Sequence, residues 1–383
     1  MSQNKYMHPR NIYKTRPNFK ELATSYPEFR KFAKQDITGK VTIDFKNQEA
    51  LRALTTTLLH KDFGLRVEIP LNHLVPALPL RLNYLLWLED LLHLSVKSRE
   101  GQTRGVDIGC GASCIYPLLA TTMKKWKMLA TEIDHESVEC ARRNVACNDY
   151  EDFITVKQVE AGTILKGALD MDDAYDFTMC NPPFFSCERE ADSSSKSRSS
   201  SRTLPRNGRT GSLSDIVVKG GEVAFILQMI QESAELRYKV KIYSTMVGLK
   251  SNFNVLKSEL EKAGVASSTH TEFSQGHTTR WGLAWTFLPE INLEMIPKSK
   301  KKKNPAPVKY VVPMPINPLY YNVSAVTSKL EALFTQLQIE YKKMKWKKES
   351  AVFEVMAQRN TWSHQRRKRR EKKNHETQHF GKK

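Results

Sequence analysis

Residues 107–113 read Asp107-Ile108-Gly109-Cys110-Gly111-Ala112-Ser113. An apolar run, Arg104 to Ile108, leads into this stretch, and helix formers begin at Ile115. A strand, a glycine-rich turn and a helix in that order bring the backbone close to a ligand at a helix N-terminus. The G-x-G spacing is a weak signal by itself, and the segment that follows decides its meaning.

The run Lys127 to Ile133 predicts a second strand that ends at Glu132. Glu132 comes 23 residues after Gly109, where a doubly wound sheet places the acid that binds ribose hydroxyls. The turn lacks the third glycine of dinucleotide sites, and no basic residues crowd it to hold a pyrophosphate. A ligand with a ribose and no phosphate therefore fits better, and S-adenosylmethionine is such a ligand.

A strand-like run, Tyr175 to Cys180, ends in Asn181-Pro182-Pro183-Phe184. The Asn181 carboxamide both donates and accepts hydrogen bonds, the Pro182 carbonyl accepts, and Phe184 offers a face for stacking. These handles suit the amino group of a planar ring, whose delocalised lone pair needs acceptors on its hydrogens before it can attack a methyl donor. The alternative is that Asn-Pro-Pro only punctuates a loop.

The pattern between and after these motifs predicts an α/β sheet of the doubly wound type. Counted from Gly109, the Asn181 turn closes the fourth strand, at the carboxyl edge where ligands bind in such sheets. The remaining expected elements are helix Ser137 to Asn148, strand Ile154 to Val159 with Thr163 in the next loop, helix Gly221 to Lys239, strand Val240 to Met246, helix Phe253 to Ala263, and a hairpin of Ser268 to Phe273 with Arg280 to Phe287. The sequence thus predicts a class I, Rossmann-like, seven-stranded fold.

Length, net charge and cysteine content limit the classes of function that are possible. A chain of 383 residues that is 40% hydrophobic can bury a sizeable core, and its net charge of +19 favours an acidic partner such as a nucleic acid. Six cysteines without a C-x-x-C pair indicate reduced thiols and neither disulfides nor a metal site. The most apolar segment, Leu71 to Leu94, is interrupted by His73, Arg81, Glu89 and Asp90, so we expect no membrane span.

The first 40 residues interleave basic and aromatic side chains and are expected to form a basic RNA-binding arm. Charge for phosphates and rings for bases are what a single strand needs, although a solvated helix with an apolar stripe explains the pattern equally well. Further elements are expected at Val41 to Phe45, a short strand, and Gln48 to Leu59, a helix. The basic residues proposed to bind RNA here are Arg10, Lys14, Arg16 and Lys20.

A helix opens near Leu78 and runs through His93, with Pro79 in its first turn. Arg81 is a cation in an otherwise apolar stretch of this helix. It either pairs with Glu89 or Asp90, or offers its bidentate fork to a cofactor carboxylate.

Composition changes sharply at two places outside the sheet. Residues 188–219 form a Ser/Arg-rich loop directly after the Asn181 turn, either a tolerated insertion or, as we favour, a flap that gates RNA. Residues 291–308 read as a linker, whose lysines could also serve nuclear import. Residues 309–360 read as a small α+β module, strand Lys309 to Met314, helix Val326 to Tyr341 and strand Ala351 to Met356, followed by a basic tail at 361–383.

Several motifs together resemble one enzyme family, the U6 small nuclear RNA adenine-N6 methyltransferases, relatives of the bacterial 23S ribosomal RNA adenine-N6 enzymes. The resemblance covers roughly residues 1–290. Its motifs are Pro79 to Tyr84, Asp107 to Pro117, Ala130-Thr131-Glu132, Cys180 to Phe185 and Thr279-Arg280-Trp281. Residue Cys110 stands where the family often has Thr.

The resemblance implies a site for S-adenosylmethionine, an adenine site and an RNA surface. The cofactor residues are expected to be Arg81, Asp107, Gly109, Gly111, Ser113, Glu132, Thr163 and Asn181. The catalytic residues are expected to be Asn181, Pro182, Pro183 and Phe184. Further RNA contacts are expected from Lys250, His277, Thr279, Arg280 and Trp281, and the module at 309–360 is expected to bind RNA.

The leading hypothesis is methyl transfer to adenine N6 in structured RNA, with U6 small nuclear RNA and hairpins of S-adenosylmethionine synthetase mRNA as the expected partners. The same turn could serve a protein glutamine-N5 methyltransferase, because an amide is also planar, but the basic arm, loop and tail would then have no use. A third reading is an RNA-binding regulator with secondary catalysis. We expect a monomer or weak dimer, no metal, and a nuclear location with some cytoplasmic protein.

Overall fold

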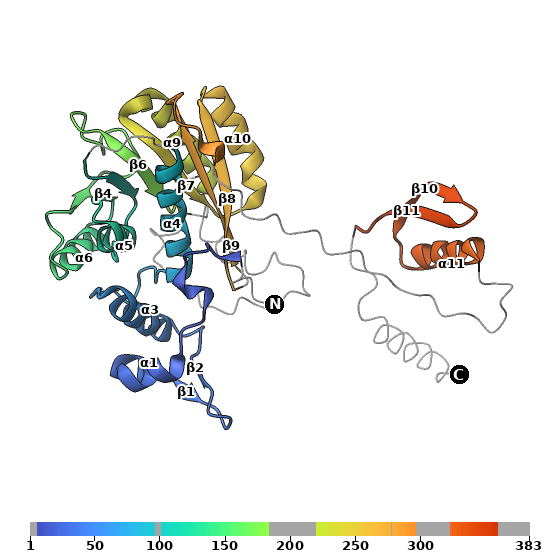
Figure 1. Ribbon diagram of the computed structural model, residues 1–383, viewed down its shortest axis with the longest axis horizontal. Helices are drawn as coiled ribbons and strands as arrows, with labels where there is room; N and C mark the ends of the chain where they lie inside the picture. Colours follow the sequence, from blue (N-terminus) through green and yellow to red (C-terminus); the bar gives the residue numbers. More distant parts are fainter. Residues whose placement is uncertain (1–5, 96–100, 184–219, 277, 296–321, 359–383) are drawn as a thin grey trace, which may run out of the picture. The chain divides into compact units, whose positions relative to one another are not determined.

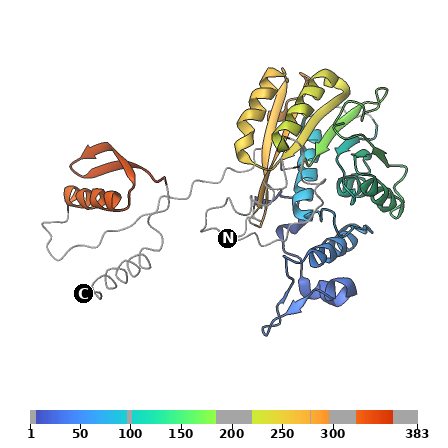
Figure 2. The same ribbon diagram turned by 180° about the vertical axis from the view of Figure 1, so that it is seen from behind.

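The computed structural model describes residues 6–95, 101–183, 220–276, 278–295 and 322–358. The chain divides into two compact units, Met1–Lys301 and Lys302–Lys383, and each is described by itself. Figure 1 shows the mixed sheet of the larger unit, and Figure 2 shows the same ribbon from behind.

The larger unit is built on a seven-stranded sheet in the order β5-β4-β3-β6-β7-β9-β8. Strands β5, β4, β3, β6 and β7 are parallel, whereas β9 runs antiparallel to both β7 and β8. The strands are β3 Arg104–Ile108, β4 Lys127–Glu132, β5 Ile154–Gln158, β6 Tyr175–Cys180, β7 Val240–Val247, β8 Ser267–Gln275 and β9 Thr278–Thr286. The predicted class I architecture, a parallel sheet closed by an antiparallel hairpin, is confirmed.

Helices cover both faces of this sheet (Figure 1). Their bounds are α4 Leu78–Ser95, α5 Ile115–Lys124, α6 His135–Ala146, α9 Gly221–Leu236 and α10 Phe253–Lys262. One apolar core gathers side chains of α4, α5 and α6 with those of the strands, and a second gathers α9 and α10 on strands β3, β6, β7 and β9. The chain order explains this division, because the helices that flank β3 and β4 cover one face and those that flank β7 cover the other.

Local capping sets several boundaries that the sequence pattern placed differently. Helix α6 begins at His135, two residues before the predicted start, because the Asp134 carboxylate accepts a hydrogen bond from the Ser137 backbone N–H at 2.8 Å. Helix α3, Gln48–Phe63, continues past the predicted Leu59 and ends at Gly64, which has φ of +70°. The predicted helix Gly221 to Lys239 ends at Leu236, and a 3-10 turn, η3, covers Arg237–Lys239.

The N-terminal segment is folded and contributes to the core. It contains η2 Ile12–Lys14, α1 Phe19–Ser25, α2 Pro27–Arg30, β1 Lys34–Gln35 and β2 Val41–Thr42, the last much shorter than the predicted strand. Tyr13 and Phe29 are buried in the same core cluster as α4. The expectation that the aromatic side chains of this arm contact the bases of a single strand is therefore wrong for Tyr13 and Phe29, because both rings are buried in the core.

The smaller unit contains a helix and a two-stranded sheet. Its elements are α11 Val323–Gln336, β10 Glu340–Lys347 and β11 Ser350–Met356. The rings of Phe334, Tyr341 and Phe353 pack together with centroids 5.3 to 5.9 Å apart. The predicted strand Lys309 to Met314 lies outside the described residues.

The predicted helix Val326 to Tyr341 is wrong at both ends. Its start moves back because the Asn322 side chain accepts a hydrogen bond from the Ala325 N–H at 2.8 Å. Its end moves back because Gln338 has φ of +53°, after which the chain turns into β10 and pairs antiparallel with β11.

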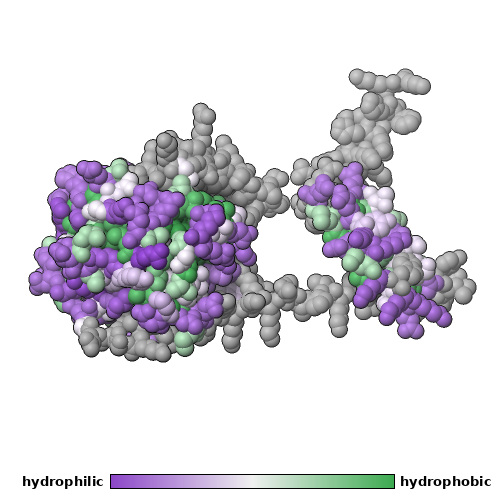
Figure 3. Space-filling view, turned by 90° about the horizontal axis from the view of Figure 1, so that it is seen from above, coloured by the Kyte–Doolittle hydropathy of each residue, from purple (hydrophilic) through white to green (hydrophobic). Residues whose placement is uncertain are grey.

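Hydrophilic residues cover most of the visible face of each unit in Figure 3, with smaller groups of apolar residues between them. Within the described residues, no helix is both long and apolar enough to cross a membrane.

Candidate active site

The glycine turn after β3 is tied to the end of β4. The backbone N–H groups of Gly109 and Cys110 both donate to the Thr131 carbonyl at 2.9 Å. Gly109 and Gly111 have φ of +71° and +64°, a conformation that favours glycine, and a Cβ added at either would meet no atom within 4 Å. The turn is therefore fixed in place with open space in front of it, as a ligand cradle requires.

The Glu132 carboxylate lies at this turn and is oriented by the backbone. One oxygen accepts from the Gly111 N–H at 2.9 Å, and the other accepts from the N–H groups of Ile133 at 2.8 Å and Asp134 at 3.2 Å. A carboxylate held in this way keeps one orientation, which suits the predicted role of an acceptor for ribose hydroxyls.

Arg81 lies in the first turn of α4 and is 8% exposed. Its Nη1 donates to the Tyr116 hydroxyl at 3.0 Å, and its Nε finds no partner among the residues that the structure describes. The alternative pairing with Glu89 or Asp90 is wrong, because Arg10 and Lys124 bind Glu89 and Arg10 also binds Asp90. Arg81 thus keeps donors for a ligand.

Asp107, at the end of β3, is completely buried, and neither oxygen of its carboxyl group has a partner within the described part of the chain. Burial raises the pKa of Asp107 to about 8, the nearby Arg81 opposes this rise, and Glu132 adds to it. Buried polar groups are normally paired. An unpaired carboxyl beside a guanidinium with free donors matches the ammonium and carboxylate of an amino-acid group.

The Asn181-Pro182-Pro183 corner follows β6 directly. The parallel register pairs Ile108 of β3 with Cys180 of β6, so Asn181 and Gly109 leave the sheet side by side. The Asn181 side-chain oxygen is buried and has no partner among the described residues. An acceptor without a partner, next to the glycine turn, is available to hold an amine hydrogen.

One cavity of about 130 Å³ joins these groups. Its lining includes the predicted residues Arg81, Gly109, Gly111, Ser113, Glu132, Thr163, Asn181, Pro182 and Pro183. It meets a shallower hollow of about 620 Å³ at Ile133 and Val159, beside the ends of β4 and β5. The structure therefore brings these predicted cofactor and catalytic residues into one place. Of the other predicted residues, Asp107 is completely buried and does not line the cavity, and Phe184 lies outside the described residues.

Two lining residues, Tyr116 and Phe225, were missed as site residues by sequence reasoning. Tyr116 lies in the first turn of α5, directly after the glycine turn, and orients Arg81. Its position after the motif is the signal that could have found it. Phe225 lies on α9, beyond the Ser/Arg-rich loop. No local sequence pattern marks it, because only the packing of α9 on the sheet brings it to the corner.

The residues predicted to bind RNA fall into two kinds in the N-terminal segment. Lys14, Arg16 and Lys20 are exposed, as phosphate contacts must be. Arg10 instead forms ion pairs with Glu89 and Asp90 of α4 and ties the segment to that helix. Its guanidinium is therefore largely occupied by ion pairs within the protein.

The loop of the predicted hairpin, expected between Phe273 and Arg280, is shorter than the sequence suggested. Strand β9 begins at Thr278, so Thr279, Arg280 and Trp281 are ladder residues opposite Ser274, Phe273 and Glu272 of β8. His277 lies outside the described residues. Lys250 is exposed in the 3-10 turn η4, Lys250–Asn252, after β7.

Within the described residues, no cluster of three or more His, Cys, Asp or Glu side chains could hold a metal ion. Five of the cysteines, Cys110, Cys114, Cys140, Cys147 and Cys180, are free thiols.

The sheet order, the glycine turn with its acid, and the Asn-Pro-Pro corner at the carboxyl edge define a class I methyltransferase site. A family described as RNA methyltransferase matches residues 1–289, and the chain belongs to this family. It methylates RNA with S-adenosylmethionine as methyl donor.

Known relatives match most of the chain. The RNA N(6)-adenosine-methyltransferase mettl16 of Danio rerio is 43% identical over 386 residues, which cover 98% of this chain and 81% of that protein. The U6 small nuclear RNA (adenine-(43)-N(6))-methyltransferase of Drosophila melanogaster is 41% identical over 290 residues, or 74% of this chain and 94% of that protein.

Solved structures match the larger unit. The hMettl16 catalytic domain in complex with MAT2A 3'UTR hairpin 1 superposes with a TM-score of 0.71 at 44% identity, covering 76% of this chain and 98% of that one. The N-terminal domain of human METTL16 in complex with SAH gives a TM-score of 0.62 at 41% identity, covering 74% of this chain and 99% of that one.

Proposed function

We propose that the chain transfers a methyl group from S-adenosylmethionine to N6 of an unpaired adenosine in structured RNA, U6 small nuclear RNA and hairpins in the mRNA of S-adenosylmethionine synthetase being the substrates. The observation that carries this proposal is the buried Asn181 oxygen, an acceptor without a described partner beside the glycine turn. A relative named for U6 and a neighbour bound to an mRNA hairpin support the choice of RNA.

The residues present fit the cofactor. Arg81 would hold its carboxylate, Asp107 its ammonium and Glu132 its ribose, while Gly109 and Gly111 allow close approach of the backbone. When bound, S-adenosylmethionine supplies a methyl group on a positively charged sulfur.

The Asn181 oxygen and the Pro182 carbonyl accept the two hydrogens of the adenine amino group and turn its lone pair out of the ring plane. Displacement at a sulfonium carbon needs no metal and no general base, because the amine becomes more acidic as the new bond forms. Positioning and preplaced acceptors therefore supply most of the rate. Phe184, which follows Pro183 in the sequence, is proposed to stack on the base.

The net charge of +19 supports a polyanionic substrate and disfavours a protein glutamine, which has no phosphates to bind. Exposed Lys14, Arg16, Lys20 and Lys250 are the proposed phosphate contacts, together with the hairpin residues Thr279, Arg280 and Trp281. We further propose that the protein acts as a monomer or weak dimer, in the nucleus and also in the cytoplasm.

Labelled S-adenosylmethionine tests the reaction. The purified full chain is incubated separately with an RNA hairpin that carries an unpaired adenosine, with the DNA hairpin of the same sequence, and with a cellular protein fraction. Nucleosides and amino acids are then identified by mass spectrometry. We expect N6-methyladenosine from the RNA arm; label on glutamine, or on another position of the RNA, would overturn the proposal.

A further inference from the structure

Strand β6 separates from β7 just before the Asn181 corner. Their register pairs Tyr175 with Val240 and Phe177 with Ile242. One step further, a parallel ladder would join the backbone of Ser244 to the Thr178 carbonyl and to the Cys180 N–H. Side-chain hydroxyls take both groups instead.

The two groups are satisfied from different elements. The Ser244 hydroxyl donates to the Thr178 carbonyl at 2.6 Å, and the Cys180 N–H donates to the Tyr84 hydroxyl at 3.3 Å. The Ser244 N–H in turn donates to the Thr178 hydroxyl at 3.2 Å. Side chains thus replace the ladder where β6 leaves the sheet, and one of them comes from α4.

Counting the hydroxyl hydrogens fixes which group donates in each of these hydrogen bonds. A serine hydroxyl has one hydrogen, and that of Ser244 goes to Thr178. In the 2.8 Å contact between Tyr84 and Ser244, the tyrosine must then donate and the serine accept. The Tyr84 oxygen keeps its lone pairs for the Cys180 N–H. The Tyr84 and Ser244 hydroxyls therefore each donate once and accept once, and neither can rotate without breaking a bond.

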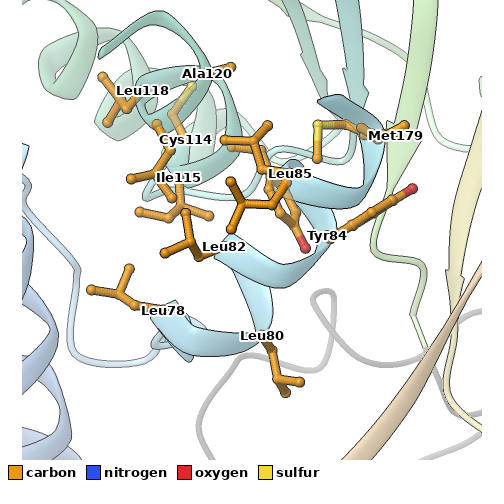
Figure 4. Packing of buried hydrophobic residues seen from close by; sticks show 14 of the residues in the cluster. Leu78, Leu80, Leu82, Tyr84, Leu85, Cys114, Ile115, Leu118, Ala120 and Met179 are labelled. Atoms are coloured by element: carbon orange, nitrogen blue, oxygen red, sulfur yellow. The ribbon is translucent and has the colours of Figure 1, made fainter. Parts of the chain in front are cut away.

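The Tyr84 ring is immobilised by its surroundings. It is completely buried, with its centroid 5.6 Å from that of Tyr116 and 5.4 Å from that of Phe273. Figure 4 shows the phenol leaving α4 on the side away from Leu118 and Ala120. The same residue thus contacts the tyrosine that orients Arg81, the strand that ends in the catalytic corner, and the outer strand β8.

We propose that Tyr84 is a positioning residue for methyl transfer, whose hydroxyl fixes the backbone of Cys180 and thereby sets the Asn181–Pro182 corner against the cofactor site. The inference rests on the proposed function, because it concerns the same corner. Cys180 directly precedes Asn181, so loss of the Tyr84 bond frees the peptide that aims the side-chain acceptor. Burial also raises the pKa of Tyr84, which keeps its hydroxyl protonated and able to donate.

The test compares Tyr84→Phe with Tyr243→Phe in the full chain. Tyr243 is also completely buried, and its hydroxyl donates to the Arg237 carbonyl at 3.0 Å, so this control removes a buried phenol hydrogen bond that does not touch the corner. Steady-state methylation of the RNA hairpin gives kcat and the KM for cofactor and RNA. Thermal unfolding reports the stability of each variant.

We expect Tyr84→Phe to lower kcat roughly 10- to 100-fold, the range that displacement of reacting groups by a fraction of an ångström to 1 Å produces, with both KM values within twofold of wild type. Tyr243→Phe should keep kcat within twofold. A merely structural role would lower the unfolding temperature of both variants and leave both kcat values alike, and that result would overturn the inference.

Two further outcomes keep the two proposals apart. Wild-type protein that makes no N6-methyladenosine overturns the proposed function, whereas active wild type with equally active Tyr84→Phe overturns only the role of Tyr84. If Tyr84→Phe does not fold, Ser244→Ala decides, because it removes the acceptor that orients the Tyr84 hydroxyl. Reduced kcat at unchanged KM supports the inference, and wild-type kcat refutes it.

Discussion

Replacing Asn181 with alanine should separate stability from activity. In most proteins, truncating a buried asparagine costs stability because its hydrogen bonds are lost. The Asn181 oxygen, however, is buried without a described partner, and such an acceptor costs about 1–3 kcal/mol while it remains unsatisfied. Removing this oxygen relieves the cost of the unsatisfied acceptor. That gain offsets the packing contacts that are lost with the side-chain amide.

The magnitudes follow from these two terms. The unfolding temperature of Asn181→Ala should stay within about 3 °C of wild type, because a residual difference near 1 kcal/mol shifts a domain of this size by about 2–4 °C. Turnover should fall by about 10² to 10³ or more, the loss that follows removal of one preplaced group at a reacting centre. RNA affinity, measured by fluorescence anisotropy on a labelled hairpin, should remain within threefold.

Asn144→Ala is the matched control. Its amide donates to the Glu68 and Ala112 carbonyls at 2.9 and 3.0 Å, and its oxygen accepts from the Glu68 N–H at 2.7 Å. This variant should lose several degrees of unfolding temperature. The reasoning fails if Asn181→Ala unfolds as early as Asn144→Ala, keeps more than a tenth of wild-type turnover, or loses RNA binding along with activity.

Four other changes probe the cofactor site and the N-terminal segment. Arg81→Lys keeps the charge but loses the bidentate guanidinium, so calorimetry should show cofactor binding weakened about 10- to 100-fold. An unchanged affinity would contradict the role assigned to Arg81. Because burial raises the pKa of Asp107 from 3.8 to about 8, its neutral form stabilises the fold fully below pH 4 and that contribution is lost as pH rises to 8. Urea unfolding without cofactor should therefore show Asp107→Asn gaining stability relative to wild type between pH 5 and pH 8.5, and parallel pH profiles would contradict this. Arg10→Gln should lower the unfolding temperature, since Arg10 pairs with Glu89. Lys14→Gln should leave the unfolding temperature unchanged and reduce the slope of log RNA affinity against log salt concentration by about one. The opposite pattern would make Arg10 the RNA contact.

The meeting of the Asn181 corner with the glycine turn could be predicted because each motif is local. The glycine turn, Glu132 and Asn181 lie at the ends of successive parallel strands, and strand ends of one polarity meet at one edge of the sheet. A strand pattern with polar residues at the strand ends therefore predicts that these residues converge at one edge of the sheet. The sequence pattern also predicted the helix from Leu78, which lies in a mostly apolar stretch, and the strand β7, which is rich in β-branched and aromatic residues.

The N-terminal segment could not be read correctly from its composition. Alternating rings and cations suit a surface that binds nucleic acid and also suit a helix that buries one face. Tyr13 and Phe29 are core residues because α4 offers them an apolar surface, which only the folded chain contains. Arg10 likewise found its carboxylates 79 and 80 residues further along the chain.

The sequence by itself determined the class of sheet, the order of its motifs and the chemical groups at its carboxyl edge, because these depend on strand pattern and short spacing. Only the tertiary structure decided which polar groups remain without partners among the described residues. Arg81 keeps donors for a ligand because Arg10 and Lys124 occupy the acids on α4, and Tyr84 reaches Cys180 because α4 packs beside β6. Hydrogen-bond pairing between distant segments is a property of the packed core, and no local pattern encodes it.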